Sequence, residues 1–159
     1  MLPARVAEGL KNSTKDLIDL CRQHSWAELT SPPDSGMRSI HEILVHLIDA
    51  EGGWINHVVR GHPRHRFKSG AFGSLDQIAK VWAPQRQETI LWMQGLTTDE
   101  RLSVRPLPWN AEEKASVEEI LWHFVTHEHY HRGQIFTRLA LLGRRDLPDH
   151  DLLRQGATS

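Results

Sequence analysis

The chain has 159 residues, a length that fits a single domain. Its 19 basic and 20 acidic side chains give a formal net charge of −1, and the lack of a basic excess argues against a nucleic-acid-binding protein. No apolar run approaches the roughly 18 residues of a membrane helix, and the N-terminus lacks the apolar segment of a signal peptide. The single cysteine, Cys21, excludes an intrachain disulfide and favours the cytoplasm as the compartment.

Apolar side chains at helical spacing predict four long helices, with no convincing strand pattern between them. They are expected over 2–24, 39–60, 74–95 and 116–142. Each of the last three begins at a serine that matches the S-x-x-E or S-x-x-Q capping pattern. Four amphipathic helices of this length favour an all-α fold, an antiparallel four-helix bundle.

Three further features complete the predicted organisation. Pro84 lies inside the third predicted helix, where we expect a kink or a break. The segment 101–108 is expected to be a short strand or an extended lid, because prolines interrupt it. We assign residues 1–143 to the metal-binding bundle and residues 144–159 to a loosely attached C-terminal tail.

The fourth predicted helix carries a row of histidines. His123, His127 and His131 recur every four residues, so they lie one above the other on the helix. Two imidazoles at i and i+4 can reach one metal ion with their free ring nitrogens. A third ligand must come from another helix, and the helical angle favours His46 and His57 about equally. The alternative is that these are ordinary core or surface histidines.

Two glutamates fall on the apolar stripes of the predicted helices, Glu51 on the second and Glu128 on the fourth. A buried carboxylate is costly unless it is paired or binds something. Each is therefore a candidate partner of a ligand imidazole, or a proton acceptor beside the metal. The alternative is an ion pair with an arginine such as Arg132 or Arg138.

Two other metal motifs fit less well. The run 127–131 matches H-E-x-x-H, the helix of zinc peptidases. The extended pattern fails, because Gln134 occupies its glycine position and Thr137 its histidine position. A di-iron carboxylate bundle needs a second E-x-x-H pair, which the other predicted helices lack.

The run from His46 to Glu51, taken with H-x₃-H-R-G-Q-I over 127–135, resembles the DinB/YfiT-like family of metalloenzymes. The resemblance covers nearly the whole chain in the order and lengths of its helices. It implies a four-helix bundle that holds one divalent metal with three histidines. By position these are His46, His127 and His131, and His123 then lines the pocket or acts in acid–base chemistry.

Three protein ligands leave one coordination position open, as in catalytic zinc sites. We therefore expect a metal-dependent enzyme for a small-molecule substrate, either a hydrolase or, as the resemblance implies, a thiol-dependent transferase. The expected cofactors are a divalent ion, zinc or nickel, and a low-molecular-weight thiol. The alternative is a non-catalytic metal- or ligand-binding stress-response protein. Glu51, Glu128 and His123 are candidate catalytic residues, Trp109 and Arg132 are candidate substrate-binding residues, and the resemblance suggests a homodimer.

Overall fold

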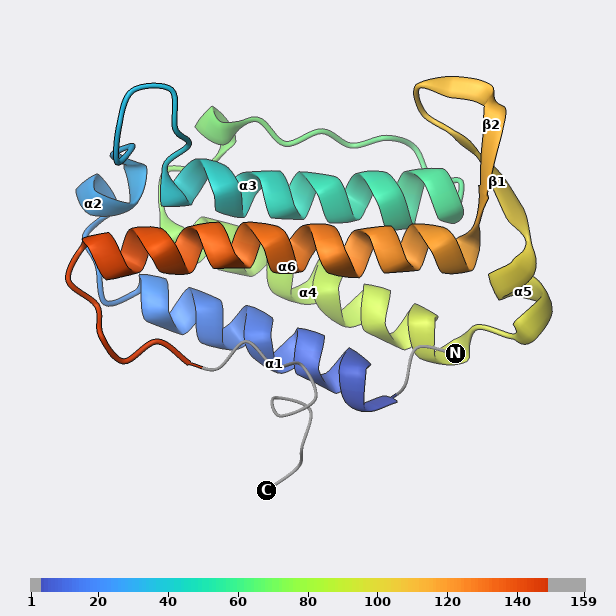
Figure 1. Cartoon of the computed structure of the whole chain (residues 1–159), viewed down its shortest axis with the longest axis horizontal. Helices are drawn as coiled ribbons and strands as arrows, with labels where there is room; N and C mark the ends of the chain where they lie inside the picture. Colours follow the sequence, from blue (N-terminus) through green and yellow to red (C-terminus); the bar gives the residue numbers. More distant parts are fainter. Residues whose placement is uncertain (1–3, 149–159) are drawn as a thin grey trace.

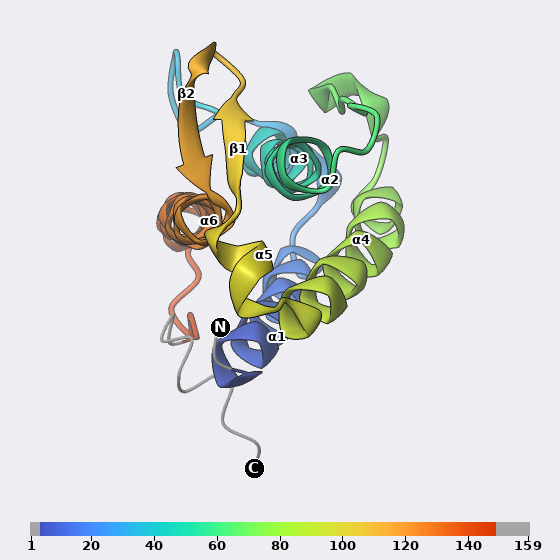
Figure 2. The same ribbon diagram turned by 90° about the vertical axis from the view of Figure 1, so that its right-hand side faces the viewer.

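The computed structural model describes residues 4–148, and four long helices dominate it. They are α1 (Ala4–Cys21), α3 (Ile40–Glu51), α4 (Leu75–Gly95) and α6 (Val117–Leu141). Helices α3 and α6 lie side by side and run antiparallel (Figure 1), and the end-on view shows the four helices at the corners of a bundle (Figure 2). The predicted all-α four-helix bundle is confirmed. Residues 1–3 and 149–159, which include most of the predicted tail, lie outside the described part.

Serine caps fix where the helices begin, and thereby the rotational position of the side chains that follow. Ser39 forms a reciprocal capping box with Glu42 at the start of α3, and Ser116 forms one with Glu119 at the start of α6. At the start of α4, Ser74 accepts its backbone hydrogen bond as predicted. The helices that carry the histidines therefore start where the sequence predicts.

The second predicted helix changes its geometry halfway. After Glu51 it continues as a π-helix, η1 (Gly52–Val59), and Gly61 ends it with a φ of 72°. Segments of π-helix are rare and are frequent at functional sites. Because each π turn holds more residues than an α turn, the residues of η1 face directions that an ideal α-helix does not predict.

The third predicted helix has no break, which corrects one of the two expectations for Pro84. Helix α4 is continuous over Leu75–Gly95 with the proline inside it. Pro84 and Lys80 are both exposed, so water can reach the Lys80 carbonyl that loses its usual N–H donor.

The connection between α4 and α6 holds an unpredicted hairpin. After the short helix α5 (Thr98–Leu102), strand β1 (Val104–Leu107) pairs antiparallel with β2 (Asn110–Ser116). The first strand lies in the segment expected to be a strand or lid. The second was missed because its side chains are polar and mostly exposed, so no apolar alternation marks it. Two other short helices, α2 (Trp26–Thr30) and η2 (Ser69–Ala71), were also missed.

The bundle core consists of two apolar clusters. One includes Leu17, Ile43 and Trp82, and the other, nearer the hairpin, includes Ile55 and Phe124. These clusters hold α3 against α6, so their facing flanks are fixed relative to each other. None of the helices in the described range is both long and apolar enough to cross a membrane.

Candidate metal centre

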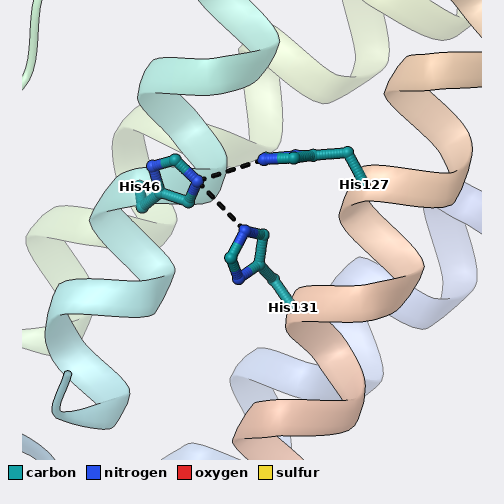
Figure 3. Close-up of side chains that lie close together, drawn as sticks. All are labelled: His46, His127 and His131. Carbon is teal, nitrogen blue, oxygen red and sulfur yellow. Dashed lines mark hydrogen bonds between the residues drawn. The ribbon is translucent and has the colours of Figure 1, made fainter. Parts of the chain in front are cut away.

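Three histidines from two helices converge on one point. His46 comes from α3, and His127 and His131 lie one turn apart on α6 (Figure 3). The Nε2 atom of His46 lies 3.2 Å from Nε2 of His127 and 3.1 Å from Nε2 of His131. His57, the other candidate third ligand, is exposed, and its Nδ1 lies 2.9 Å from the carbonyl oxygen of His62. The structure thus brings together the three histidines that the family resemblance implies.

The spacing of these nitrogens fits a tetrahedral metal ion. Two metal–nitrogen bonds of about 2.0–2.1 Å at a tetrahedral angle place their nitrogens roughly 3.3 Å apart. The distances of 3.2 and 3.1 Å from His46 Nε2 are close to that value. All three potential ligand atoms lie within 4.8 Å of one another. A small adjustment of side-chain angles is therefore enough to seat one ion.

Electrostatics keep the three imidazoles neutral, the form in which histidine binds metal. Burial lowers the pKa of His46 to about 4, and the neighbouring His131 and Arg38 add to this effect. Burial likewise lowers the pKa of His127 to about 4, with further contributions from His131 and His46. The pKa of His131 is also lowered, mainly by burial.

One hydrogen bond fixes the orientation of His131. Its Nδ1 lies 2.8 Å from Oε1 of Gln134, one turn further along α6. Because an amide oxygen only accepts hydrogen bonds, this contact places the proton on Nδ1 and leaves the Nε2 lone pair facing the other two histidines. The sequence marks Gln134 only as part of a motif, and the structure shows that it hydrogen-bonds a candidate ligand.

A cavity of about 650 Å³ opens beside His46 and His131, between the C-terminal half of α6 and the loop before α3. It connects the three-histidine cluster to solvent on that side. Its other lining residues are Pro33, Gly36, Met37, Arg38, Tyr130, Gln134, Thr137, Arg138 and Leu141.

On the other side of the cluster, aromatic rings lead to the hairpin. His123 packs near His127, with ring centroids 5.7 Å apart, and against Trp54 of η1 at 4.7 Å. Trp54 in turn packs against Trp109, at 5.9 Å. Trp109 is 64% exposed at the hairpin turn, so it reaches the histidines only through Trp54 and His123. The sequence reasoning missed Trp54 as a neighbour of the site, although it lies eight residues after His46.

The structure turns both candidate glutamates toward arginines. Oε2 of Glu51 accepts a hydrogen bond from Trp82 Nε1 at 2.9 Å and lies 3.0 Å from Arg86. Glu128 pairs with Arg86 and with Arg132. In the described part of the chain, neither carboxylate is hydrogen-bonded to a histidine of the cluster. The structure therefore supports the alternative, an arginine ion pair for each glutamate, and places neither of them as a proton acceptor beside the histidines.

The prediction that Arg132 binds substrate is wrong. Its side chain is only 3% exposed and pairs with Glu128. Its Nη1 donates to the backbone oxygen of Ser13 at 2.5 Å, and its Nη2 donates to Thr14 Oγ1 at 3.0 Å. Arg132 therefore ties α6 to α1 and has no surface available to a ligand.

Comparisons with known proteins agree with this picture. Residues 10–135 match the model of the DinB superfamily. YizA of Bacillus subtilis (strain 168), named an uncharacterized protein, is 26% identical over 115 residues, which is 72% of each chain.

Solved structures of similar fold include two DinB-like proteins. One, YjoA of Bacillus subtilis, has a TM-score of 0.71 at 17% identity and covers 91% of this chain and 96% of its own. The other, from Bacillus cereus ATCC 10987, has a TM-score of 0.71 at 15% identity, with 88% and 90% covered. YfiT of Bacillus subtilis has a TM-score of 0.69 at 14% identity, with 89% and 86% covered. It is described as "a probable metal-dependent hydrolase with an unusual four-helix bundle topology".

Proposed function

The chain belongs to the DinB superfamily, and from this premise we propose that His46, His127 and His131 bind one divalent metal ion, zinc or nickel, in a catalytic site. The observation that carries the proposal is the convergence of three Nε2 atoms beside an open cavity. Three protein ligands leave a fourth position for water or substrate, which is the pattern of catalytic zinc sites.

The proposed reaction is hydrolysis of a small molecule, or transfer to it of a low-molecular-weight thiol. When bound, the ion supplies Lewis-acid activation. Gln134 holds the proton of His131 on Nδ1, and His123, which is exposed beside His127, is placed to accept or donate a proton. Burial raises the pKa of Cys21 to about 12, so the thiol of a transfer reaction must come from outside the chain. The description of YfiT favours the hydrolase.

A zinc peptidase of the H-E-x-x-H type is not proposed. In that motif the glutamate between the histidines serves as general base. Here the corresponding Glu128 is 2% exposed and is bound by Arg86 and Arg132. The third histidine of the cluster also comes from a preceding helix, α3, rather than from a downstream segment.

Metal analysis of the protein as purified, followed by activity screening, tests the proposal. We expect about one zinc or nickel ion per chain, and turnover of a small ester, amide or thiol acceptor that stops with chelator and returns with metal. Bound metal with no turnover across these classes would favour the non-catalytic binding protein. Absence of metal, after incubation with either ion, would overturn the proposal.

We also propose that the protein is a cytoplasmic homodimer. The family resemblance suggests the dimer, and large apolar side chains on the surface give it support. Those exposed on the long helices are Leu91, Trp122, Tyr130 and Leu141. A stable isologous interface buries more than about 1,000 Å² in total. Light scattering at micromolar concentration should give the dimer mass, and a monomer mass would contradict it.

A further inference from the structure

We propose that the cavity beside the metal centre binds an anionic group of the substrate, with Arg38 and Arg138 as its anchors. The inference rests on the proposed function, because it takes the reaction to occur at the three histidines. It adds the chemical class of the substrate, a small molecule that carries a carboxylate, phosphate or sulfonate.

The charged side chains that line the cavity are all basic. The lining holds Arg38 and Arg138, together with His46 and His131, and it includes no aspartate or glutamate. Within residues 4–148, neither arginine forms an ion pair. By contrast, seven other arginines pair with carboxylates, namely Arg22, Arg60, Arg64, Arg86, Arg101, Arg132 and Arg144. Two guanidinium groups without an ion-pair partner in one cavity favour an anion.

Hydrogen bonds hold the two arginines next to each other. Arg138 Nε donates to the backbone oxygen of Arg38 at 2.7 Å, and Arg138 Nη1 donates to the backbone oxygen of Gln134 at 3.0 Å. These bonds fix the half-buried guanidinium of Arg138. Its Nη2 forms no hydrogen bond with any described residue, so this donor remains for a ligand. Because the position of Arg138 is set in advance, anion binding loses little side-chain entropy.

The same helix sets the distance between the anion and the reacting bond. Arg138 follows His131 by seven residues on α6, which is roughly 10 Å along the helix axis. Tyr130 also lines the cavity, and its hydroxyl group is a further donor. The expected substrate therefore has its anionic group several bonds away from the atom that reacts at the metal centre.

Matched hydroxamates test the proposal in the zinc-loaded protein. A hydroxamate binds metal, and straight-chain compounds of several lengths can end in either a carboxylate or a methyl group. We expect the carboxylate form of the best-fitting length to bind at least about tenfold more tightly, since hydrogen bonds to charged groups are stronger than those between neutral groups. Arg38→Gln and Arg138→Gln should remove the preference and leave the methyl form unaffected. Arg66→Gln, which removes an exposed charge outside the cavity, should change neither.

A second arm separates this proposal from the metal proposal. Pyrophosphate is titrated into metal-free wild-type protein and into the Arg38→Gln/Arg138→Gln variant, at a pH where the histidines are neutral. We expect binding to the wild type that the double variant loses. If the protein binds no metal but the wild type binds pyrophosphate and the double variant does not, the metal centre would be overturned and the anion site would be supported. Equal pyrophosphate binding by the two proteins, or equal affinity of the two hydroxamate forms for the wild type, would overturn the anion site.

Discussion

Arg86 of α4 lies 3.0 Å from Glu51 of α3 inside the core, with the two side chains 2% and 0% exposed. Arg86 also pairs with Glu128 of α6, and Glu128 pairs with Arg132, which reaches the backbone of Ser13 on α1. Two arginines and two glutamates thus neutralise each other and link all four long helices. Burial of this charge is tolerable only while the set is complete.

Replacing Arg86 by Met should therefore destabilise the fold by about 3–5 kcal/mol, because it leaves Glu51 and Glu128 buried without their shared cation. Urea unfolding of the metal-free protein measures the change. Arg60→Met provides a control, since Arg60 pairs with the mostly exposed Glu88 and such pairs contribute at most about 1 kcal/mol. A loss for Arg86→Met no larger than that of the control would contradict this account of the core.

Replacing His127 by Ala should abolish metal binding and leave the stability of the metal-free protein nearly unchanged, because the apolar core forms without the cluster. Metal titration and thermal unfolding measure the two effects. In the wild type, metal at about 100 times its Kd should stabilise the fold by about 2.7 kcal/mol. His57→Ala, at an exposed histidine beyond α3, should behave as the wild type. Full metal occupancy in His127→Ala would exclude His127 as a ligand.

The local features of the site could be predicted from sequence, and the long-range ones could not. His127 and His131 lie one turn apart on one helix, so helical geometry alone pairs them. The choice between His46 and His57 was open because the periodicity assumes an α-helix throughout. The π-helix that begins at Gly52 rotates His57 away from the direction predicted for it, while His46 precedes this change. At the level of sequence, only the family resemblance favours His46 over His57 as the third ligand.

For the two buried glutamates, the sequence predicts that they are buried but does not predict which side chains they pair with. The apolar stripes placed Glu51 and Glu128 in the core, and both are buried. Their common partner, Arg86, lies on a third helix, 35 positions after Glu51 and 42 before Glu128. Helical periodicity carries no information about such pairs. The sequence offers Arg138 only as a possible partner of a buried glutamate, and its contact with the backbone of Arg38, 100 positions away, cannot be predicted for the same reason.

Metal-free protein should lose stability as the pH falls from about 6.5 to about 4. In the folded chain the pKa values of His46 and His127 are lowered from 6.5 to about 4. Over this range the unfolded chain binds protons that the folded chain does not, so protonation favours unfolding. Thermal unfolding across this range measures the loss. The variant His46→Asn/His127→Asn should show a smaller loss than the wild type, and an equal pH dependence would contradict the assignment.

Gln134→Leu should weaken metal binding by about 10–100-fold, since residues that hydrogen-bond a ligand histidine typically contribute this much. The change removes the acceptor that lies 2.8 Å from His131 Nδ1, so the Nδ1 proton is no longer fixed. Gln134→Glu keeps an acceptor and should bind metal at least as tightly as the wild type. Thr137→Ala, which alters the same cavity at a hydroxyl bonded to Gly133, should retain wild-type affinity.

¹⁵N NMR of the His131 ring in metal-free protein tests whether the Gln134 hydrogen bond, rather than packing, orients His131. The Nδ1–H tautomer should dominate in the wild type and in Gln134→Glu, and it should lose its dominance in Gln134→Leu. An unchanged tautomer and unchanged affinity in Gln134→Leu would show that His131 is oriented by packing alone.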